Sequence, residues 1–418
     1  MKTINNIQNW NKGLQFVICI NAANILVPDR FKGLPVIMLL LLVVYRYFKL
    51  DQKPIIATKT YSISISFFLI LLLSIFYTSN VTYGLRHLET SLSLIVFPTV
   101  FYVISDDKKV LNKNFINTVK KVFILSVIIF LVSTFTYFYI SEPYYVLKST
   151  IVHYTNLVDI RIDYYKIHPI YLSIYIGAAI IFTASLIKTN QKENRFLFHF
   201  ILLILLMFMV ILNKKGPILS ICLIGLIYLF KNAISKRKTV SISLGLVVFI
   251  SAIIFMPKYR DINRFEELLS FGQFQNNKDS STNIRLQIYN CSLKLIAQSP
   301  FFGYGWGDVK AVLNSCYIKT NENLLKNYYN SHNQFLSILL SSGLIGFSAF
   351  IYYLFYLFKV SNINNDQVLF FLVLFFTLNM LSENILERED GVIIFSFLIN
   401  LYIFSLAREN TQKTFHYD

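Results

Sequence analysis

The sequence predicts an all-α membrane protein, a polytopic bundle of about twelve transmembrane helices with one large, partly helical loop on the outer face. Hydrophobic residues make up 55% of the 418 residues and charged residues only 15%. A soluble domain usually carries about 25% charged residues. The mean hydropathy is +0.54. Apolar runs alternate with short basic loops, and about 20 apolar residues are enough to cross a bilayer as a helix.

Twelve apolar runs are candidates for these spans. The first, which begins at Gly13, lacks a small-residue cleavage site and is interpreted as a retained helix. Gly216-Pro217 separates the seventh run from the eighth, because Gly-Pro ends one helix and Pro can start the next. The predicted spans cover residues 13–28, 33–48, 60–78, 84–105, 119–140, 168–188, 196–213, 216–232, 239–256, 332–358, 367–385 and 390–407.

Orientation follows from lysine and arginine, which concentrate in alternate short loops. Lys108 and Lys236 lie in two of these basic loops. The positive-inside rule makes such loops cytoplasmic, so Asn80, Ser280 and His332 are predicted outside and both termini inside. The net charge of +17 is therefore interpreted as a signal of orientation and not of nucleic-acid binding.

The chain divides into spans one to nine, the large outer loop, and spans ten to twelve with a cytoplasmic tail, at residues 1–256, 257–331 and 332–418. Within the loop, apolar residues recur with helical spacing over 285–298, and a turn follows at 299–307. Cys291 and Cys316 share this loop. If it is extracytoplasmic they can form a disulfide, although sequence alone fixes no geometry.

Two residues beside the loop are candidates for chemistry. His332 begins the tenth span at the outer membrane boundary. An imidazole there can take a proton from a hydroxyl near neutral pH, or it can simply hydrogen-bond a neighbour. Arg285 lies near the N-terminus of the predicted loop helix, where a guanidinium opposes the helix dipole unless both hold an anion. A solvated loop arginine is the alternative.

Further basic residues lie at the predicted outer ends of spans. Lys214 and Lys215 end the seventh span, either as a phosphate clamp or as a pair that snorkels to the interface. Arg86 in the fourth span and His168 before the sixth have the same two interpretations. Lys214, Lys215 and Arg86 are candidates for holding an anionic substrate group, with His168 and Glu383 as possible support.

Carboxylates follow the eleventh span. Glu383 and Glu387 lie one helical turn apart, and carboxylates so close to lipid are costly unless solvated or paired. Glu383 can partner a cation or His332. The stretch from Glu387 to Asp390 is expected to be a polar external turn.

Several familiar sites are missing from the sequence. Gly303, Gly305 and Gly307 are preceded by no predicted strand and followed by no Gly-Lys-Ser/Thr, so a tight turn is expected in place of a phosphate loop. Neither a metal-ligand spacing nor a serine nucleophile elbow is recognisable. The sequence therefore predicts no metal and no cofactor.

An ordered set of motifs points to a known family. The arginine-containing helix precedes Ser299-Pro300-Phe301-Phe302-Gly303-Tyr304-Gly305; next come Ser331-His332-Asn333-Gln334-Phe335-Leu336 and Gly343-Leu344-Ile345-Gly346. His168-Pro169-Ile170-Tyr171 and Ser382-Glu383-Asn384 fit the same pattern. Together they resemble the O-antigen ligase and polysaccharide polymerase superfamily of membrane glycosyltransferases. The resemblance is best over residues 284–391 and looser from about 84 onward.

This resemblance implies a GT-C-like fold and transfer of a glycan without a metal or cofactor. The donor would be linked to undecaprenyl diphosphate in the inner (cytoplasmic) membrane of a bacterium, with the active site facing the periplasm. The acceptor would be another glycan, the lipid A core of lipopolysaccharide, or a protein hydroxyl. The partners would thus be these substrates and membrane lipid.

Carried over to this chain, the resemblance gives roles to individual residues. His332 would be the general base or would orient the acceptor, and Arg285 would hold the diphosphate. The family's second basic position, usually an arginine, falls at Lys214 or Lys215. Lysine offers a point charge and not a bidentate fork, so this chain departs from the family there.

Two other functional classes compete with this interpretation of the sequence. A flippase or secondary transporter for lipid-linked glycans would place charges deep within spans and often shows internal repeats. Here the notable charges cluster at the outer ends. A non-enzymatic partner in envelope assembly would need no cluster of histidine, arginine and lysine. The sequence does not distinguish a ligase from a polymerase or a protein transferase.

Overall fold

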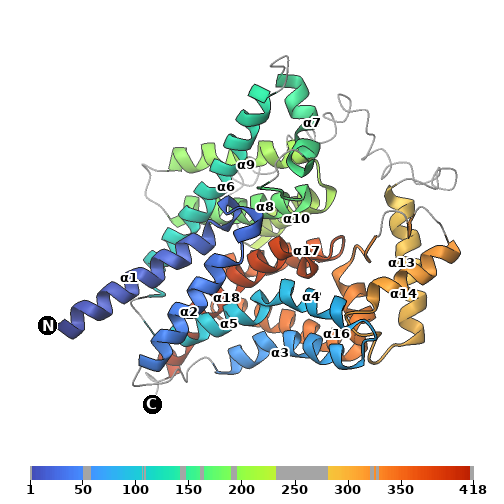
Figure 1. Cartoon of the computed structure of the whole chain (residues 1–418). Helices are drawn as coiled ribbons and strands as arrows, with labels where there is room; N and C mark the ends of the chain where they lie inside the picture. The colour runs from blue at the N-terminus through green and yellow to red at the C-terminus, as the bar shows by residue number, and fades with distance from the viewer. Residues whose placement is uncertain are drawn as a thin grey trace.

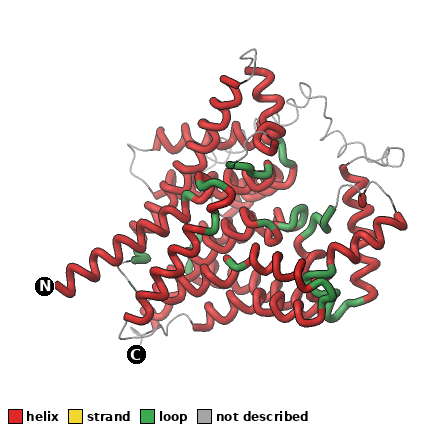
Figure 2. The backbone as a smooth tube through the Cα atoms, viewed as in Figure 1, coloured by secondary structure: helices red, strands yellow, loops and turns green. Residues whose placement is uncertain are grey.

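A computed structural model describes residues 2–49, 58–105, 107, 110–141, 147–160, 164–189, 195–231, 281–320, 324–325 and 329–414. All regular secondary structure in these residues is helical, which confirms the predicted all-α bundle (Figure 2).

The helices are long where the sequence is apolar and break at polar or glycine-containing turns. In chain order the elements are α1 (Lys2–Ala22), η1 (Asn24–Leu26), η2 (Asp29–Phe31), α2 (Leu34–Lys49), α3 (Thr58–Ser74), η3 (Ile75–Tyr77), α4 (Val81–Ser91), α5 (Ser93–Ile104), α6 (Lys113–Ser141), α7 (Leu147–Ile160), α8 (Pro169–Thr189), α9 (Arg195–Leu212), α10 (Lys215–Lys231), α13 (Ser281–Gln298), α14 (Val309–Thr320), α16 (Gln334–Ile363), α17 (Gln367–Met380), η6 (Ile385–Glu387) and α18 (Glu389–Thr414) (Figure 1).

Eight helical stretches among the described residues are long and apolar enough to cross a membrane. They match the predicted spans two to seven, ten and twelve. The first, eighth and eleventh predicted spans correspond to α1, α10 and α17, of which α10 has 17 residues and α17 has 14. The predicted ninth span, 239–256, lies outside the described residues, so the total of twelve stays a prediction.

Two helices form the interior of the bundle. In the 18-residue apolar stretches of α8 and α18, 83% is buried within the protein, against 28% in the stretch within Asp29–Lys49. α8 packs on α6, α9 and α17, and α18 packs on α5. Since a helix satisfies its own backbone hydrogen bonds, apolar side chains can face either lipid or protein, and small residues such as Gly177 allow close approach of α8 to α17.

The glycine motifs of the sequence interlock around a break in α16. Gly343 has φ 60° inside this helix. A Cβ at Gly343 would lie 2.3 Å from the carbonyl of Phe301, so no other residue fits there. Backbone hydrogen bonds join the two motifs, from Tyr304 N–H to the Leu340 carbonyl (2.8 Å) and from Leu344 N–H to the Pro300 carbonyl (2.8 Å). The expected turn at 299–307 is therefore confirmed, and it docks the loop helices onto α16.

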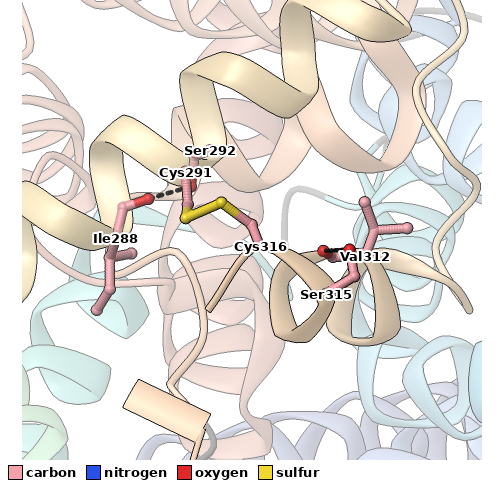
Figure 3. The surroundings of a disulfide bond; sticks show 6 residues. All are labelled: Ile288, Cys291, Ser292, Val312, Ser315 and Cys316. Atoms are coloured by element: carbon pink, nitrogen blue, oxygen red, sulfur yellow. Dashed lines mark hydrogen bonds between the residues drawn. A yellow bond between two sulfur atoms is a disulfide. The ribbon is translucent and has the colours of Figure 1, made fainter. Parts of the chain in front are cut away.

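Helices α13 and α14, hereafter the cap, lie side by side at one end of the bundle (Figure 1). The helix predicted over 285–298 is α13. Cys291 of α13 and Cys316 of α14 form a disulfide (Figure 3). Ile288, Leu313 and Tyr317 pack with this disulfide and with Leu340 of α16 into a small apolar core. The disulfide thus joins the two helices of the cap, and apolar packing on Leu340 ties the cap to the bundle.

Two of the five positions used for the predicted orientation are described, and both touch the cap. The backbone N–H of Asn80 donates to Asp308 at the start of α14 (2.9 Å), and the carbonyl of His332 accepts from Tyr289 of α13 (3.3 Å). That both residues lie on the outer side of the membrane stays a prediction. Lys108, Lys236 and Ser280 lie outside the described residues, as does most of the first third of the predicted outer loop.

Candidate active site

A cavity of about 390 Å³ lies between the cap and the bundle. Its walls come from α4, the turn before α14, α14 itself, the segment that leads into α16, and the turn around η6. The cavity brings together residues far apart in sequence, from Tyr83 to Arg388. Clustering of polar groups in one concave site is the usual mark of a ligand site.

His332 lies on this cavity wall, two residues before α16 begins. Its Nδ1 lies 3.6 Å from Oε2 of Glu383, and the imidazole side chain is 23% exposed while the carboxylate side chain is 8% exposed. Asn333 caps α16 by accepting from the N–H groups of Phe335 (2.9 Å) and Leu336 (3.2 Å). The arrangement gives an imidazole with a carboxylate on one ring nitrogen and a cavity beside it.

The carboxyl of Glu383 is held in its charged form. Burial opposes ionisation, but the contact with His332 and the positive charge of Arg285 outweigh it and lower the pKa of Glu383 below its usual range. A buried carboxylate of this kind orients an imidazole and stabilises the imidazolium that forms when it takes a proton.

His168 lines the same cavity and behaves in the opposite way. Burial, together with the positive charges of Arg388 and Lys214, lowers its pKa to about 4. His168 is therefore neutral near pH 7. Its ring is suited to hydrogen bonding a substrate or a neighbour, and not to supplying positive charge.

Hydrogen bonds fix the loop that carries Glu383 against the start of α16. Gln334 accepts from the N–H of Leu386 (2.7 Å), and the hydroxyl of Ser331 pairs with Asn384 (3.0 and 3.2 Å). Tyr171 of α8 donates to the Asn384 carbonyl (3.1 Å). The buried polar groups thus find partners and hold His332 and Glu383 in register.

The opposite wall is aromatic and cationic. His87 of α4 stacks on Trp306 (5.7 Å between ring centroids) and meets Tyr83 edge-on (4.6 Å). Lys310 of α14 lies 5.7 Å from the Tyr83 ring centroid. Asp308 anchors this wall by accepting from the N–H groups of Ser79 and Asn80 (2.6 and 2.9 Å).

Of the basic residues predicted for a phosphate, three lie around this centre without lining the cavity. Arg285 on α13 and Lys214 in the turn after α9 are close enough to influence Glu383 and His168, respectively. Lys215 begins α10, and Gly216 beside it lies so close to Ser382 that a Cβ would be 2.7 Å from its hydroxyl. This contact places the turn that contains Lys214 and Lys215 next to the loop that carries Glu383.

Arg86 is placed differently. It lies on an exposed face of α4, while His87, one residue later, lines the cavity. Among the residues the structure describes, the cavity wall contains His332, His168 and Glu383 from the predicted set, but not Arg86, Arg285, Lys214 or Lys215. The proposed roles of these four residues in anion binding stay predictions.

Comparison with known proteins agrees with the motifs. Residues 200–351 match the family model described as O-antigen ligase. The resemblance to this superfamily is thereby confirmed. The matched stretch contains both lysines after α9, Arg285 and His332.

Two relatives match parts of the chain. An uncharacterised protein of Haemophilus influenzae is 27% identical over 177 residues, which are 40% of this chain and 43% of the relative. A protein of Acinetobacter baylyi named ComP-specific O-oligosaccharyltransferase is 26% identical over 209 residues, 49% of this chain and 37% of the relative. The matches thus cover less than half the length of both relatives.

Several residues that line the cavity were not expected there from the sequence. Trp306 lies within the glycine turn and Lys310 follows it, and only their proximity to that motif hints at the site. Glu387 and Arg388 also line the cavity, although the sequence predicted a plain polar turn there. Within that turn Glu387 accepts from Asn330 (3.3 Å) and from the hydroxyl of Ser337.

Proposed function

We propose that this protein is a glycosyltransferase of the O-antigen ligase type. It would move a glycan from a polyprenyl-diphosphate carrier, undecaprenyl diphosphate in bacteria, to an acceptor hydroxyl at the outer face of the inner membrane. The observation that carries the proposal is the His332–Glu383 pair in a polar cavity beneath the cap, within a chain that matches the O-antigen ligase family.

In the proposed reaction His332 accepts the proton of the acceptor hydroxyl through Nε2. The acceptor oxygen forms a bond to the anomeric carbon of the glycan as the bond from that carbon to the diphosphate oxygen breaks. The leaving diphosphate keeps the electron pair. Glu383, 3.6 Å from Nδ1, stabilises the imidazolium that results.

Charge develops on the diphosphate oxygens as they leave, and cations placed beforehand stabilise that charge. Lys310 and Arg388 line the cavity. Arg285 on α13 lies close enough to affect the charge of Glu383, and Lys214, which Lys215 follows, lies close enough to affect that of His168. We assign the diphosphate to this set, with Arg285 as its bidentate member. Among the described residues, no group of three or more His, Cys, Asp or Glu side chains is placed to hold a metal ion.

Three acceptors remain within the proposal: a lipid A core, another glycan repeat, and a protein hydroxyl. The name of the Acinetobacter baylyi relative supports the third, since that protein is described as an oligosaccharyltransferase specific for ComP. The three share the chemistry of a hydroxyl that loses its proton.

The test is transfer by purified protein in detergent, with a polyprenyl-diphosphate-linked glycan as donor and each acceptor class in turn. Appearance of glycosylated acceptor with release of polyprenyl diphosphate is expected. No transfer to any of the three acceptors, combined with movement of the intact donor across the bilayer of vesicles, would instead identify a flippase. A deletion strain examined for surface glycan then separates the acceptors, because ligase loss leaves lipid-linked polymer unattached.

A further inference from the structure

His332 has a backbone conformation that its residue type rarely adopts. Its φ is 45°, in the left-handed region that favours glycine. Among the described residues only two asparagines share a positive φ without being glycine, and asparagine tolerates this region. Such a conformation persists where the surroundings hold it, and it is frequent at functional sites.

Two hydrogen bonds hold the His332 backbone. Its N–H donates to Oδ1 of Asn330 (3.1 Å), and its carbonyl accepts from the Tyr289 hydroxyl of the cap (3.3 Å). The first bond closes a local turn. It forms only when the amide oxygen of Asn330, and not its NH₂ group, faces His332.

Glu387 determines which way the Asn330 amide faces. Its Oε2 accepts from Nδ2 of Asn330 (3.3 Å), and its Oε1 accepts from the hydroxyl of Ser337 in the first turn of α16. A carboxylate has no donor, so only the NH₂ end of the amide can pair with it. The amide oxygen is then directed at the His332 N–H. Glu387, 57 residues after Asn330 in sequence, thus acts on the His332 backbone through a single amide group.

We propose that Glu387 is a positioning residue for His332: through Asn330 it holds the His332 backbone in the left-handed conformation that presents the imidazole to the cavity. The inference rests on the proposed function, in which that imidazole receives the acceptor proton. Glu387 itself needs no contact with substrate in this role. Because it also lines the cavity, the experiment must separate positioning from direct contact.

The experiment measures kcat, the KM for donor, and donor binding in purified variants. Glu387→Ala and Asn330→Ala should each lower kcat by about ten- to a hundredfold, with donor KM and binding nearly unchanged, because a misplaced imidazole loses reactivity and not donor affinity. Glu387→Gln keeps an oxygen that accepts from Asn330, so its kcat should recover to within about threefold of the parent. A Glu387→Gln variant as slow as Glu387→Ala would mean that the charge matters and would overturn the proposal.

The double variant tests whether the two residues act in series. Removal of both side chains should slow transfer no more than removal of Asn330 alone, because one chain of bonds is already broken. Multiplied losses would show that Glu387 acts on the substrate or through another route, and the proposal would fail.

Folding is controlled by thermal midpoints in detergent, with Glu389→Gln as the matched change at an exposed carboxylate of the same turn. Should Glu387→Ala fail to fold, Asn330→Ala breaks the same link without altering that turn, and an unchanged kcat would overturn the inference. His332→Ala is assayed in parallel. Absence of transfer by the unaltered protein would refute the proposed function. Full transfer by His332→Ala would refute the role of His332 as the base, and with it the positioning role. Loss of transfer in His332→Ala, with normal kcat in the other variants, would refute the positioning role alone.

Discussion

Charged residues that are close neighbours in the turn before α18 have two different surroundings. Asp390 at the start of α18 binds Lys32 with 2.6 Å between Oδ1 and Nζ, and Asp29 binds the same ammonium at 2.7 Å. The Lys32 side chain is 5% exposed. Glu387 and Arg388, a few residues earlier, line the cavity of His332. We refer to Asp29, Lys32 and Asp390 as the ion latch.

The ion latch and the cavity show how placement decides the role of a charge. In the latch, a cation lies between two carboxylates and joins the beginning of α2 to that of α18, so its charges are satisfied within the protein. In the cavity, cationic and acidic groups face a space that a substrate can enter. Removal of one partner of the buried ion latch should destabilise the fold. Replacement of a charged residue in the cavity should leave the fold intact and impair catalysis.

The largest expected effect on stability therefore lies in the ion latch. Lys32→Ala leaves two carboxylates without their cation and should lower the free energy of unfolding by about 3–5 kcal/mol. Lys310→Ala, in the cavity wall, should cost at most about 0.5 kcal/mol of stability yet reduce transfer. Thermal or denaturant unfolding in detergent measures both, with Arg30→Ala as the control at an exposed cation beside the latch. Equal destabilisation by the two lysine variants would remove the distinction drawn here.

The disulfide of the cap should have the next largest effect. Cys291→Ser opens a bond that spans 25 residues, and the expected loss is about 3 kcal/mol by loop-closure arguments. Because the cap supplies Tyr289 and Lys310, transfer should fall as well. Serine at Cys19 or Cys222, whose thiols are free, is the matched control. If reduction with a thiol leaves both unfolding and transfer unchanged, the cap is held by packing alone.

A smaller effect concerns pH and His168. Burial, Arg388 and Lys214 lower its pKa to about 4, whereas an unfolded histidine titrates near 6.5. The unfolded chain therefore binds the extra proton first, and stability should fall as pH drops from about 6.5 toward 4. His168→Gln should flatten this dependence between pH 6.5 and 4.5, above the range in which Glu383 titrates. Parallel thermal midpoints for the two proteins across this window would contradict the assignment.

The smallest effect tests the strained backbone at the site. With φ at 45°, His332→Gly should be more stable than His332→Ala by about 1 kcal/mol, because glycine adopts this conformation without a steric penalty. Both variants lack the imidazole, so the comparison isolates the backbone. Unfolding midpoints measured side by side decide it, and an alanine variant as stable as the glycine variant would mean that the backbone relaxes.

Sequence predicted the parts of this molecule that depend on local pattern. Apolar runs gave the helices, the spacing over 285–298 gave α13, and His332 and Glu383 were chosen for their place at span ends. The cysteines Cys291 and Cys316 were recognised as a pair that can bond, and they are bonded.

What sequence did not reveal depends on distant contacts. The break in α16 arises because Gly343 meets Phe301 of another segment. Glu387 and Asp390 looked like one exposed turn, but one binds Asn330 and the other Lys32, more than 350 residues away. Lys310 lines the cavity because Asp308 holds α14 against the residues that precede α4. The local sequence around a residue does not indicate such distant partners.

The most direct test of the account is His332→Ala, assayed for glycan transfer and for donor binding in the same purified preparation. A general base contributes about 10²–10⁴-fold, so transfer should fall by that factor or below detection. Donor binding and the thermal midpoint should persist, because the cations hold the diphosphate and the residue lies outside the packed bundle. Near-normal transfer by the folded variant would contradict the central claim and make Glu383 the next candidate base. Loss of donor binding together with transfer would move His332 to the donor site.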